Sequence, residues 1–191
     1  MKLKDGMLLY HGSYTPFEHI DLKLCVPGKD FGQGFYLTSD LNQAKNFIRS
    51  VVDRAQARGL IPVTQDYGFI SSYRYRTPQK GLKVYEFLSA DREWLWFIAG
   101  NRRRKLIPAL HQQIEGIASS DIVIGKVAND QTNPVLAAYL NGLYGDIQTE
   151  EAVNEAIRRL IPDHLMDQYC FLTDRAVNCL EFQEARKQDV R

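Results

Sequence analysis

The chain has 191 residues, of which 45% are hydrophobic and 25% are charged, and its formal net charge is +1. This length and composition are ordinary for a soluble globular domain, so we expect residues 1–191 to form a single domain with a substantial core. The near-zero charge excludes a field that would draw the whole molecule to nucleic acid or to a membrane, so function is expected in a local site.

The N-terminal segment and the cysteines favour a reducing compartment. Residues 1–6 contain no apolar stretch of a signal peptide, and no run approaches the length of a membrane span. The cysteines are odd in number, widely spaced and without a C-x-x-C pair, which argues against a disulfide framework and against a metal site. We therefore expect buried or half-buried thiols, no metal and no membrane partner in a cytoplasmic protein. A delivered effector would have the same features. The cysteines are Cys25, Cys170 and Cys179.

The first half of the chain predicts two strands and a long helix. Residues 8–11 form an apolar strand that ends at a Gly-Ser pair, and residues 35–38 form a second strand. Ser39 or Asp40 is a suitable N-cap for a helix whose apolar residues recur at helical spacing up to residue 55. Gly59 then ends this helix.

The second half alternates between strands and helices without regular βαβ order, which favours the α+β class. Residues 62–81 alternate weakly and predict an irregular hairpin, whereas 82–88 predict a half-buried strand. A strand with a glycine break is expected at 121–128, and a last strand pair at 168–172 and 179–182. Helical spacing of apolar residues predicts three further helices, around 94–98, 135–143 and 153–160.

Two short runs combine a polar ring with glycines. Residues 8–13 read LLYHGS, and residues 28–38 read GKDFGQGFYLT. Glycine lets a backbone lie flat against a ligand, so we expect His11 and Tyr36 to face one cleft. The glycines precede a strand, whereas those of a dinucleotide-binding fingerprint follow one. A glycine-rich turn, a structural histidine and an ordinary strand tyrosine remain the alternatives.

The order of these runs, followed by an amphipathic helix, resembles the mono-ADP-ribosyltransferase superfamily. Within it, the sequence is similar to the His-Tyr-Glu branch of diphtheria-type toxins and poly(ADP-ribose) polymerases. It looks closest to a bacterial domain-of-unknown-function family found in toxin–antitoxin-like settings. The resemblance continues through residues 101–102, 121–130 and 167–171, so it covers most of the chain. It implies two small, mainly antiparallel sheets packed as a split β-barrel, flanked by helices, with NAD between the sheets.

The resemblance also implies roles for five residues that would bind NAD as a substrate. His11 would hydrogen-bond the adenosine ribose, and the main chain of Gly12 would bind the nicotinamide carboxamide. Ser13 would add a ribose or carboxamide contact, and Gly34 belongs to the same cofactor-binding set. Tyr36 would stack on the nicotinamide ring and hold it in the pose from which the glycosidic bond breaks.

The third catalytic position departs from the branch, because Gln168 stands where a glutamate is expected. Glutamine keeps a hydrogen bond but carries no charge. A carboxylate about 5 Å from a developing positive charge contributes on the order of 3 kcal/mol at an effective dielectric near 20. Its loss would slow the reaction roughly a hundredfold. Asp167, Asp174 and Asp130 are the candidate compensating carboxylates.

The function that the resemblance implies is NAD-dependent mono-ADP-ribosyl transfer to a macromolecular acceptor, by a bacterial toxin or effector with a neutralising antitoxin as partner. If water replaces the acceptor, the enzyme is an NAD glycohydrolase. The alternative is a catalytically weakened module that binds NAD, ADP-ribose or a protein, which Gln168 favours. A third hypothesis is an interaction domain with an unused cleft.

Two polar segments remain open to more than one interpretation. The basic run 102–105 is either a solvated face or a contact to an acidic partner, to nucleic acid or to the NAD pyrophosphate. Asn129 and Asp130 either face the substrate or only form a turn.

Overall fold

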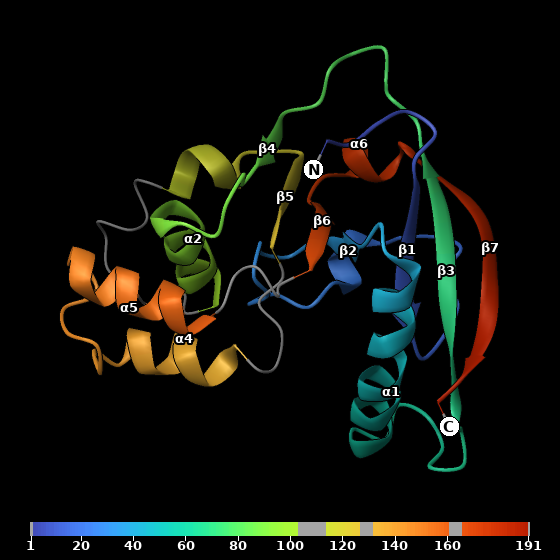
Figure 1. Cartoon of the computed structure of the whole chain (residues 1–191). Helices are drawn as coiled ribbons and strands as arrows, with labels where there is room; N and C mark the ends of the chain where they lie inside the picture. Colours follow the sequence, from blue (N-terminus) through green and yellow to red (C-terminus); the bar gives the residue numbers. More distant parts are fainter. Residues whose placement is uncertain (1, 103–113, 127–131, 161–165, 191) are drawn as a thin grey trace.

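A computed structural model describes residues 2–102, 114–126, 132–160 and 166–190, whose strands form two sheets (Figure 1). The three-stranded sheet is antiparallel and has the order β1 (Leu8–Ser13), β3 (Tyr67–Tyr75) and β7 (Leu180–Asp189). The four-stranded sheet has the order β2 (Phe35–Leu37), β6 (Asp167–Phe171), β5 (Ile122–Lys126) and β4 (Val84–Glu86). Among the strands of the described residues, only β4 and β5 pair in parallel.

The two sheets meet where β1 lies beside β2. Tyr10 and Thr38 exchange main-chain hydrogen bonds of 2.8 and 3.0 Å in an isolated antiparallel bridge. In the part of the chain that the structure describes, the strands do not close into a barrel. Strands and helices are interspersed as expected, which confirms the α+β class.

The helices lie in two groups, visible in Figure 1. The long helix α1 (Leu41–Ala57) packs on β1 and β3, whereas α2 (Arg92–Arg102), α4 (Asn133–Leu140) and α5 (Glu150–Leu160) gather on the far side of the four-stranded sheet. The short ones are η1 (Leu22–Leu24), a helical stretch at 114–118, and α6 (Asp174–Val177).

The ends of α1 are those that the sequence predicts. The carboxylate of Asp40 accepts hydrogen bonds from the main-chain N–H groups of Asn42 and Gln43. Arg58 caps the C-terminus, and Gly59 follows it with φ +68°. This left-handed conformation favours glycine after a helix.

The hairpin expected at residues 62–81 is wrong, because β3 is one nine-residue strand at the centre of its sheet. The sequence does not predict this strand because small buried residues interrupt the alternation of large apolar side chains that is typical of a strand. A Cβ on Gly68 would lie 2.6 Å from the Ser13 carbonyl oxygen and 2.8 Å from Ile48. The weak pattern therefore marks a strand pressed closely under α1.

The expected last strand pair is also corrected. β6 pairs with β2 and β5, whereas β7 pairs with β3 in the other sheet, and α6 lies between them in the chain. β7 runs to Asp189, well beyond the predicted residue 182. Its C-terminal half is mostly exposed and carries charged side chains, which suits an edge strand.

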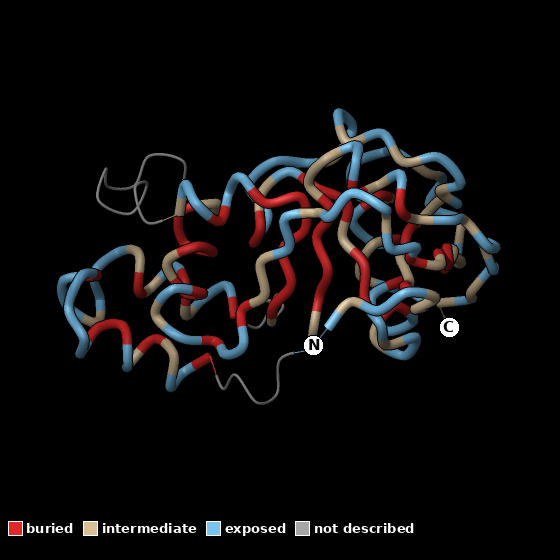
Figure 2. Tube along the Cα trace, turned by 90° about the horizontal axis from the view of Figure 1, so that it is seen from above, coloured by how far each residue is buried: buried red, intermediate tan, exposed pale blue. Residues whose placement is uncertain are grey.

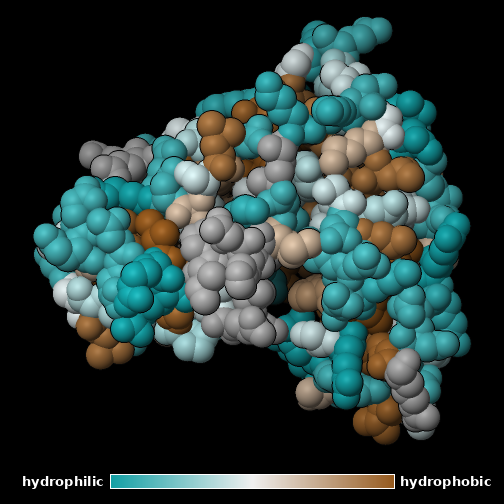
Figure 3. All heavy atoms as spheres, in the orientation of Figure 1, coloured by the Kyte–Doolittle hydropathy of each residue, from teal (hydrophilic) through white to brown (hydrophobic). Residues whose placement is uncertain are grey.

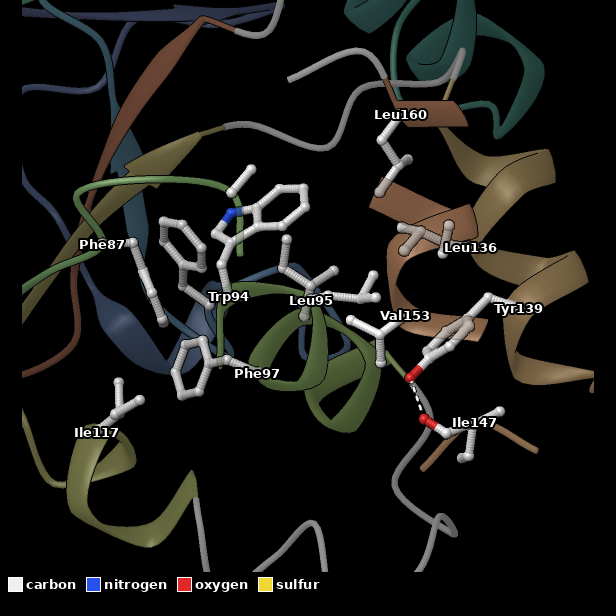
Figure 4. Close-up of a cluster of buried hydrophobic side chains, with 14 of the residues drawn as sticks. Phe87, Trp94, Leu95, Phe97, Ile117, Leu136, Tyr139, Ile147, Val153 and Leu160 are labelled. Carbon is white, nitrogen blue, oxygen red and sulfur yellow. Dashed lines mark hydrogen bonds between the residues drawn. The ribbon is translucent and has the colours of Figure 1, made fainter. Parts of the chain in front are cut away.

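Buried side chains form separate clusters on the two faces of the four-stranded sheet. Figure 2 shows the buried residues, in red, along the central strands and on the helices beside them. The cluster on the α2 side is rich in aromatic rings, and Figure 4 shows it around Trp94, with the Tyr139 hydroxyl bonded to the Ile147 carbonyl. Tyr36 and Cys170 pack with this cluster. The opposite face holds Phe35, Leu37, Tyr169 and Phe171, in a cluster shared with Leu9 and Tyr73 of the other sheet. Residues of β2 and β6 therefore alternate between the two faces.

The cysteines match the expectation of buried or half-buried thiols. All three are free; Cys25 is half-buried, and Cys170 and Cys179 are buried. Within the described ranges, no helix is long and apolar enough to cross a membrane.

Candidate functional site

His11 lies at the junction of the two sheets and is fixed by the main chain of Tyr36. Its Nδ1 is 2.8 Å from the Tyr36 carbonyl oxygen. Its ring lies 4.6 Å from that of Phe35 and meets the ring of Phe17 edge-on at 5.6 Å. Burial lowers the pKa of His11, and the bond to the carbonyl opposes this effect. Because a carbonyl oxygen only accepts, the neutral ring carries its proton on Nδ1, which leaves Nε2 as an acceptor.

Gly12 and Ser13 continue β1 under α1. A Cβ on Gly12 would lie 2.7 Å from the Ala44 carbonyl oxygen and 3.3 Å from Ile48 Cδ1, so the helix packs on bare backbone. Ser13 is buried. The close packing of α1 therefore explains why a glycine occupies position 12. The binding role of its main chain stays a prediction.

Tyr36 is anchored through its hydroxyl to the segment that precedes β2. The oxygen accepts from the Phe31 N–H at 3.0 Å and donates to the Gly32 carbonyl at 2.7 Å. Burial raises the pKa of the hydroxyl, so it stays protonated at neutral pH. The ring is therefore held in one orientation, on the face of β2 opposite to Phe35.

Gly34 lies against β6. A Cβ there would be 2.6 Å from Cys170 Sγ and 2.8 Å from the Phe171 carbonyl oxygen. Because Gly34 has no side chain, its backbone can approach β6 closely. A contact of Gly34 with NAD stays a prediction.

Gln168 lies next to a buried carboxylate that sequence reasoning missed. Its Nε2 donates to Asp30 Oδ2 at 3.3 Å, and each of the two residues is 6% exposed. Asp30 Oδ1 accepts from Arg102 Nε at 2.7 Å and from Nη2 at 2.6 Å. Asn101 Nδ2 donates to the Asp30 carbonyl oxygen at 3.0 Å. The turn before β2 is thereby tied to the end of α2 and to β6.

Two of the three predicted compensating carboxylates lie elsewhere. Asp167 pairs with Lys126 at 3.1 Å. Asp174 begins α6, beyond the end of β6 that is farther from Gln168. Asp130 lies outside the described residues, as does Asn129. Asp30 belongs to the glycine-rich run, but its partner is 138 residues away, so no local pattern indicates the contact.

Positive charge gathers around the same turn. Desolvation lowers the pKa of Lys29, the guanidinium groups of Arg54, Arg102 and Arg58 lower it further, and Asp30 opposes them. Of the predicted basic run, Arg102 binds Asp30, and residues 103–105 lie outside the described residues. In Figure 3 the surface is hollowed between the part built on α2, α4 and α5 and the part built on α1.

The predicted site residues are therefore joined in two groups. Tyr36 and Gln168 project from the same face of the four-stranded sheet, since Tyr36 pairs with Cys170 and Gln168 is two residues from it. His11 lies on the other face against Phe35, and its link to Tyr36 is the main-chain carbonyl, so the structure does not bring the two rings into one cleft as the sequence predicts. Among the described residues, no three His, Cys, Asp or Glu side chains are grouped as metal ligands. The arrangement offers hydrogen-bonding groups for a polar ligand.

Comparison with known proteins assigns the chain to a family. The model of a family described as a protein of unknown function, DUF3990, matches residues 7–182. The chain belongs to the DUF3990 family. None of the curated proteins compared with it matches. The stretch matched by the DUF3990 model contains His11, Asp30, Tyr36 and Gln168, so both groups of site residues lie within the family's own domain.

Proposed function

We propose that the chain is an NAD-dependent mono-ADP-ribosyltransferase that modifies a macromolecular acceptor, as a bacterial toxin or effector held in check by a neutralising partner. The observation that carries the proposal is the setting of His11. Its Nδ1 lies 2.8 Å from the Tyr36 carbonyl oxygen, so that in the neutral ring, which the lowered pKa favours, Nε2 accepts, and His11 directly precedes the close-packed main chain of Gly12. A ribose hydroxyl is a suitable donor to such a nitrogen.

In this proposal NAD, as substrate, supplies an ADP-ribosyl group that passes to a nucleophile of the acceptor as nicotinamide leaves. His11 binds the adenosine ribose, and Gly12 binds the carboxamide, with Ser13 and Gly34 beside them. Tyr36 stacks on the nicotinamide ring. Its hydroxyl is already occupied by the main chain of residues 31 and 32, so the ring is oriented before the substrate arrives.

The cations around Asp30 support binding of a diphosphate. Arg54, Arg58 and Arg102 each lie near enough to Lys29 to lower its pKa. Guanidinium groups bind phosphate oxygens strongly, and their planar donors match that geometry. We place the pyrophosphate of NAD near this group. The two sheets that meet at β1 and β2 are also consistent with the split barrel that the resemblance implies.

A second candidate function is a module of the same fold that binds NAD, ADP-ribose or a protein without efficient transfer. Gln168 favours it, because an amide offers a ribose hydroxyl a hydrogen bond but carries no charge to stabilise an oxocarbenium-like transition state. Both functions predict that the chain binds NAD, but only the transferase consumes it at an appreciable rate.

The deciding experiment incubates the purified chain with labelled NAD in a cell lysate, with calorimetric titration of NAD in parallel. The variants are His11→Ala, His11→Ala/Tyr36→Ala and, as a control histidine on the exposed surface, His19→Ala. We expect label on a macromolecule with the wild type and with His19→Ala only. Binding that needs His11 but leaves no label favours the binding module, and free ADP-ribose without label favours a glycohydrolase. Absence of both binding and turnover rejects the proposal.

A further inference from the structure

We propose that Asp30 is a positioning residue for Gln168: it fixes the orientation of the amide and places a negative charge one hydrogen bond behind it. The inference rests on the proposed function, in which the amide of Gln168 contacts the nicotinamide ribose. The carboxylate of Asp30 would thereby supply the negative charge that a glutamate at position 168 would carry.

The orientation follows from the donors and acceptors present. An ionised carboxylate only accepts, so the group that Gln168 turns toward Asp30 is its NH₂, at 3.3 Å. The opposite orientation would place two oxygens face to face. Gln168 Oε1 is therefore directed away from Asp30 and is left to accept from a hydroxyl. A glutamate would present an acceptor there in either orientation, whereas a glutamine does so only if its amide is fixed.

Asp30 is itself held in place. Two nitrogens of Arg102 bind Oδ1, and Asn101 binds the main-chain oxygen of the same residue. Arg102 thus sits on the oxygen away from Gln168, while Oδ2 faces the amide. At 6% exposure there is little water to screen Oδ2, so its charge polarises the amide and makes Oε1 a stronger acceptor.

The same contacts would also be present if Asp30 only held the turn before β2 against β6 and had no effect on the reaction. Exchanging the two groups separates the two roles. Asp30→Asn leaves two amides in contact, and Gln168→Glu places two carboxylates next to each other, where they repel. The double variant Asp30→Asn/Gln168→Glu restores one carboxylate and one amide with donor and acceptor exchanged. It also moves the charge to position 168.

The experiment measures nicotinamide release and denaturant unfolding for the wild type, both single variants and the double variant. We expect each single variant to lower kcat at least about tenfold while KM for NAD stays within about threefold, because the group acts in the transition state. The double variant should regain kcat to within about threefold of the wild type or exceed it. Glu181→Gln is the control, since it converts a carboxylate to an amide in the exposed Arg76–Glu181 pair and should change neither parameter.

The unfolding free energies of the four proteins form a double-mutant cycle, which measures the contact between Asp30 and Gln168 without any substrate. Stability losses of the single variants that are not additive in the double variant support the hydrogen bond, and additive losses overturn it. A double variant no faster than the slower single variant, or Gln168→Glu alone faster than the wild type, overturns the role of Asp30 while leaving the proposed function intact. A wild type that neither binds nor turns over NAD rejects the proposed function, and the unfolding cycle then still decides whether Asp30 orients Gln168.

Discussion

The two ends of the candidate site are held by different forces. At the His11 end, rings and bare backbone are in close contact: Phe35 lies against the imidazole, and Gly12 lies under the main chain of α1. At the Gln168 end, a chain of polar side chains runs from Gln168 through Asp30 to Arg102. The first end should be sensitive to volume and the second to charge. This difference can be tested at each end with a matched control.

Removing the cation of the polar end should have the largest effect. Arg102→Ala takes the guanidinium away from the buried Asp30 carboxylate, and we expect a loss of about 3 kcal/mol in the free energy of unfolding. The side chains of this pair are 20% and 8% exposed, against 49% and 52% for Arg76 and Glu181. Arg76→Ala should therefore cost less than about 1 kcal/mol. Equal losses in denaturant titrations would remove the distinction between the two ends.

Adding one methyl group at Gly12, in the His11 end of the site, should also lower the free energy of unfolding. In Gly12→Ala the new Cβ would meet the Ala44 carbonyl oxygen at 2.7 Å, so α1 must shift on β1, and we expect a loss of about 2 kcal/mol. The control is Gly116→Ala, in a helical stretch where a Cβ meets nothing within 4 Å. There the better helix propensity of alanine should leave stability unchanged or raise it slightly. A harmless Gly12→Ala in thermal unfolding would show that α1 is not tightly packed on β1.

Tyr36 connects the two ends, and its hydroxyl should contribute a smaller amount. Tyr36→Phe keeps the ring but leaves the Phe31 N–H and the Gly32 carbonyl without this partner, at a cost of about 1–2 kcal/mol. We expect faster hydrogen exchange at the Phe31 amide in the variant. Tyr85→Phe is the control, because its partner Glu93 is exposed and can be solvated by water. An unchanged Phe31 amide would mean that the hydroxyl does not hold this segment.

The smallest expected effect is a pH dependence at His11. Its pKa is lowered by burial below the ordinary value of 6.5, so the unfolded chain binds more protons just below that pH. The free energy of unfolding therefore rises with pH through this window, and the stabilisation is lost as the pH falls. His11→Asn keeps an amide donor for the Tyr36 carbonyl but does not titrate there. The wild type should lose more stability than His11→Asn between pH 7.5 and pH 5, and parallel unfolding curves would contradict the shift.

The parts of the fold that the sequence predicts are those set by neighbours in the chain. Asp40 caps α1 because its carboxylate reaches the next two amides, and Gly59 follows the cap because it takes a positive φ. β3 is missed because its buried positions include Gly68, Ser71 and Ser72, which give no strand pattern until α1 and β7 cover them.

The candidate site divides in the same way. The contact between His11 and the β2 main chain joins two runs that the sequence singles out for their rings and glycines. The carboxylate beside Gln168 depends on residues that are 138 and 72 positions from Asp30 along the chain. Only the pairing of β2 with β6 and the position of α2 bring these groups together. Such distant partners leave no periodicity or motif to detect.

The three-residue strand β2 uses both of its faces and its main chain at once. Its register with β6 sends Phe35 to one cluster and Tyr36 to the other, while the Tyr36 carbonyl holds His11. A slip of one residue would exchange these faces and withdraw the carbonyl from the imidazole. The segment between Gly34 and Thr38 therefore cannot gain or lose a residue without dismantling the candidate site, so a deletion there would abolish function and packing together.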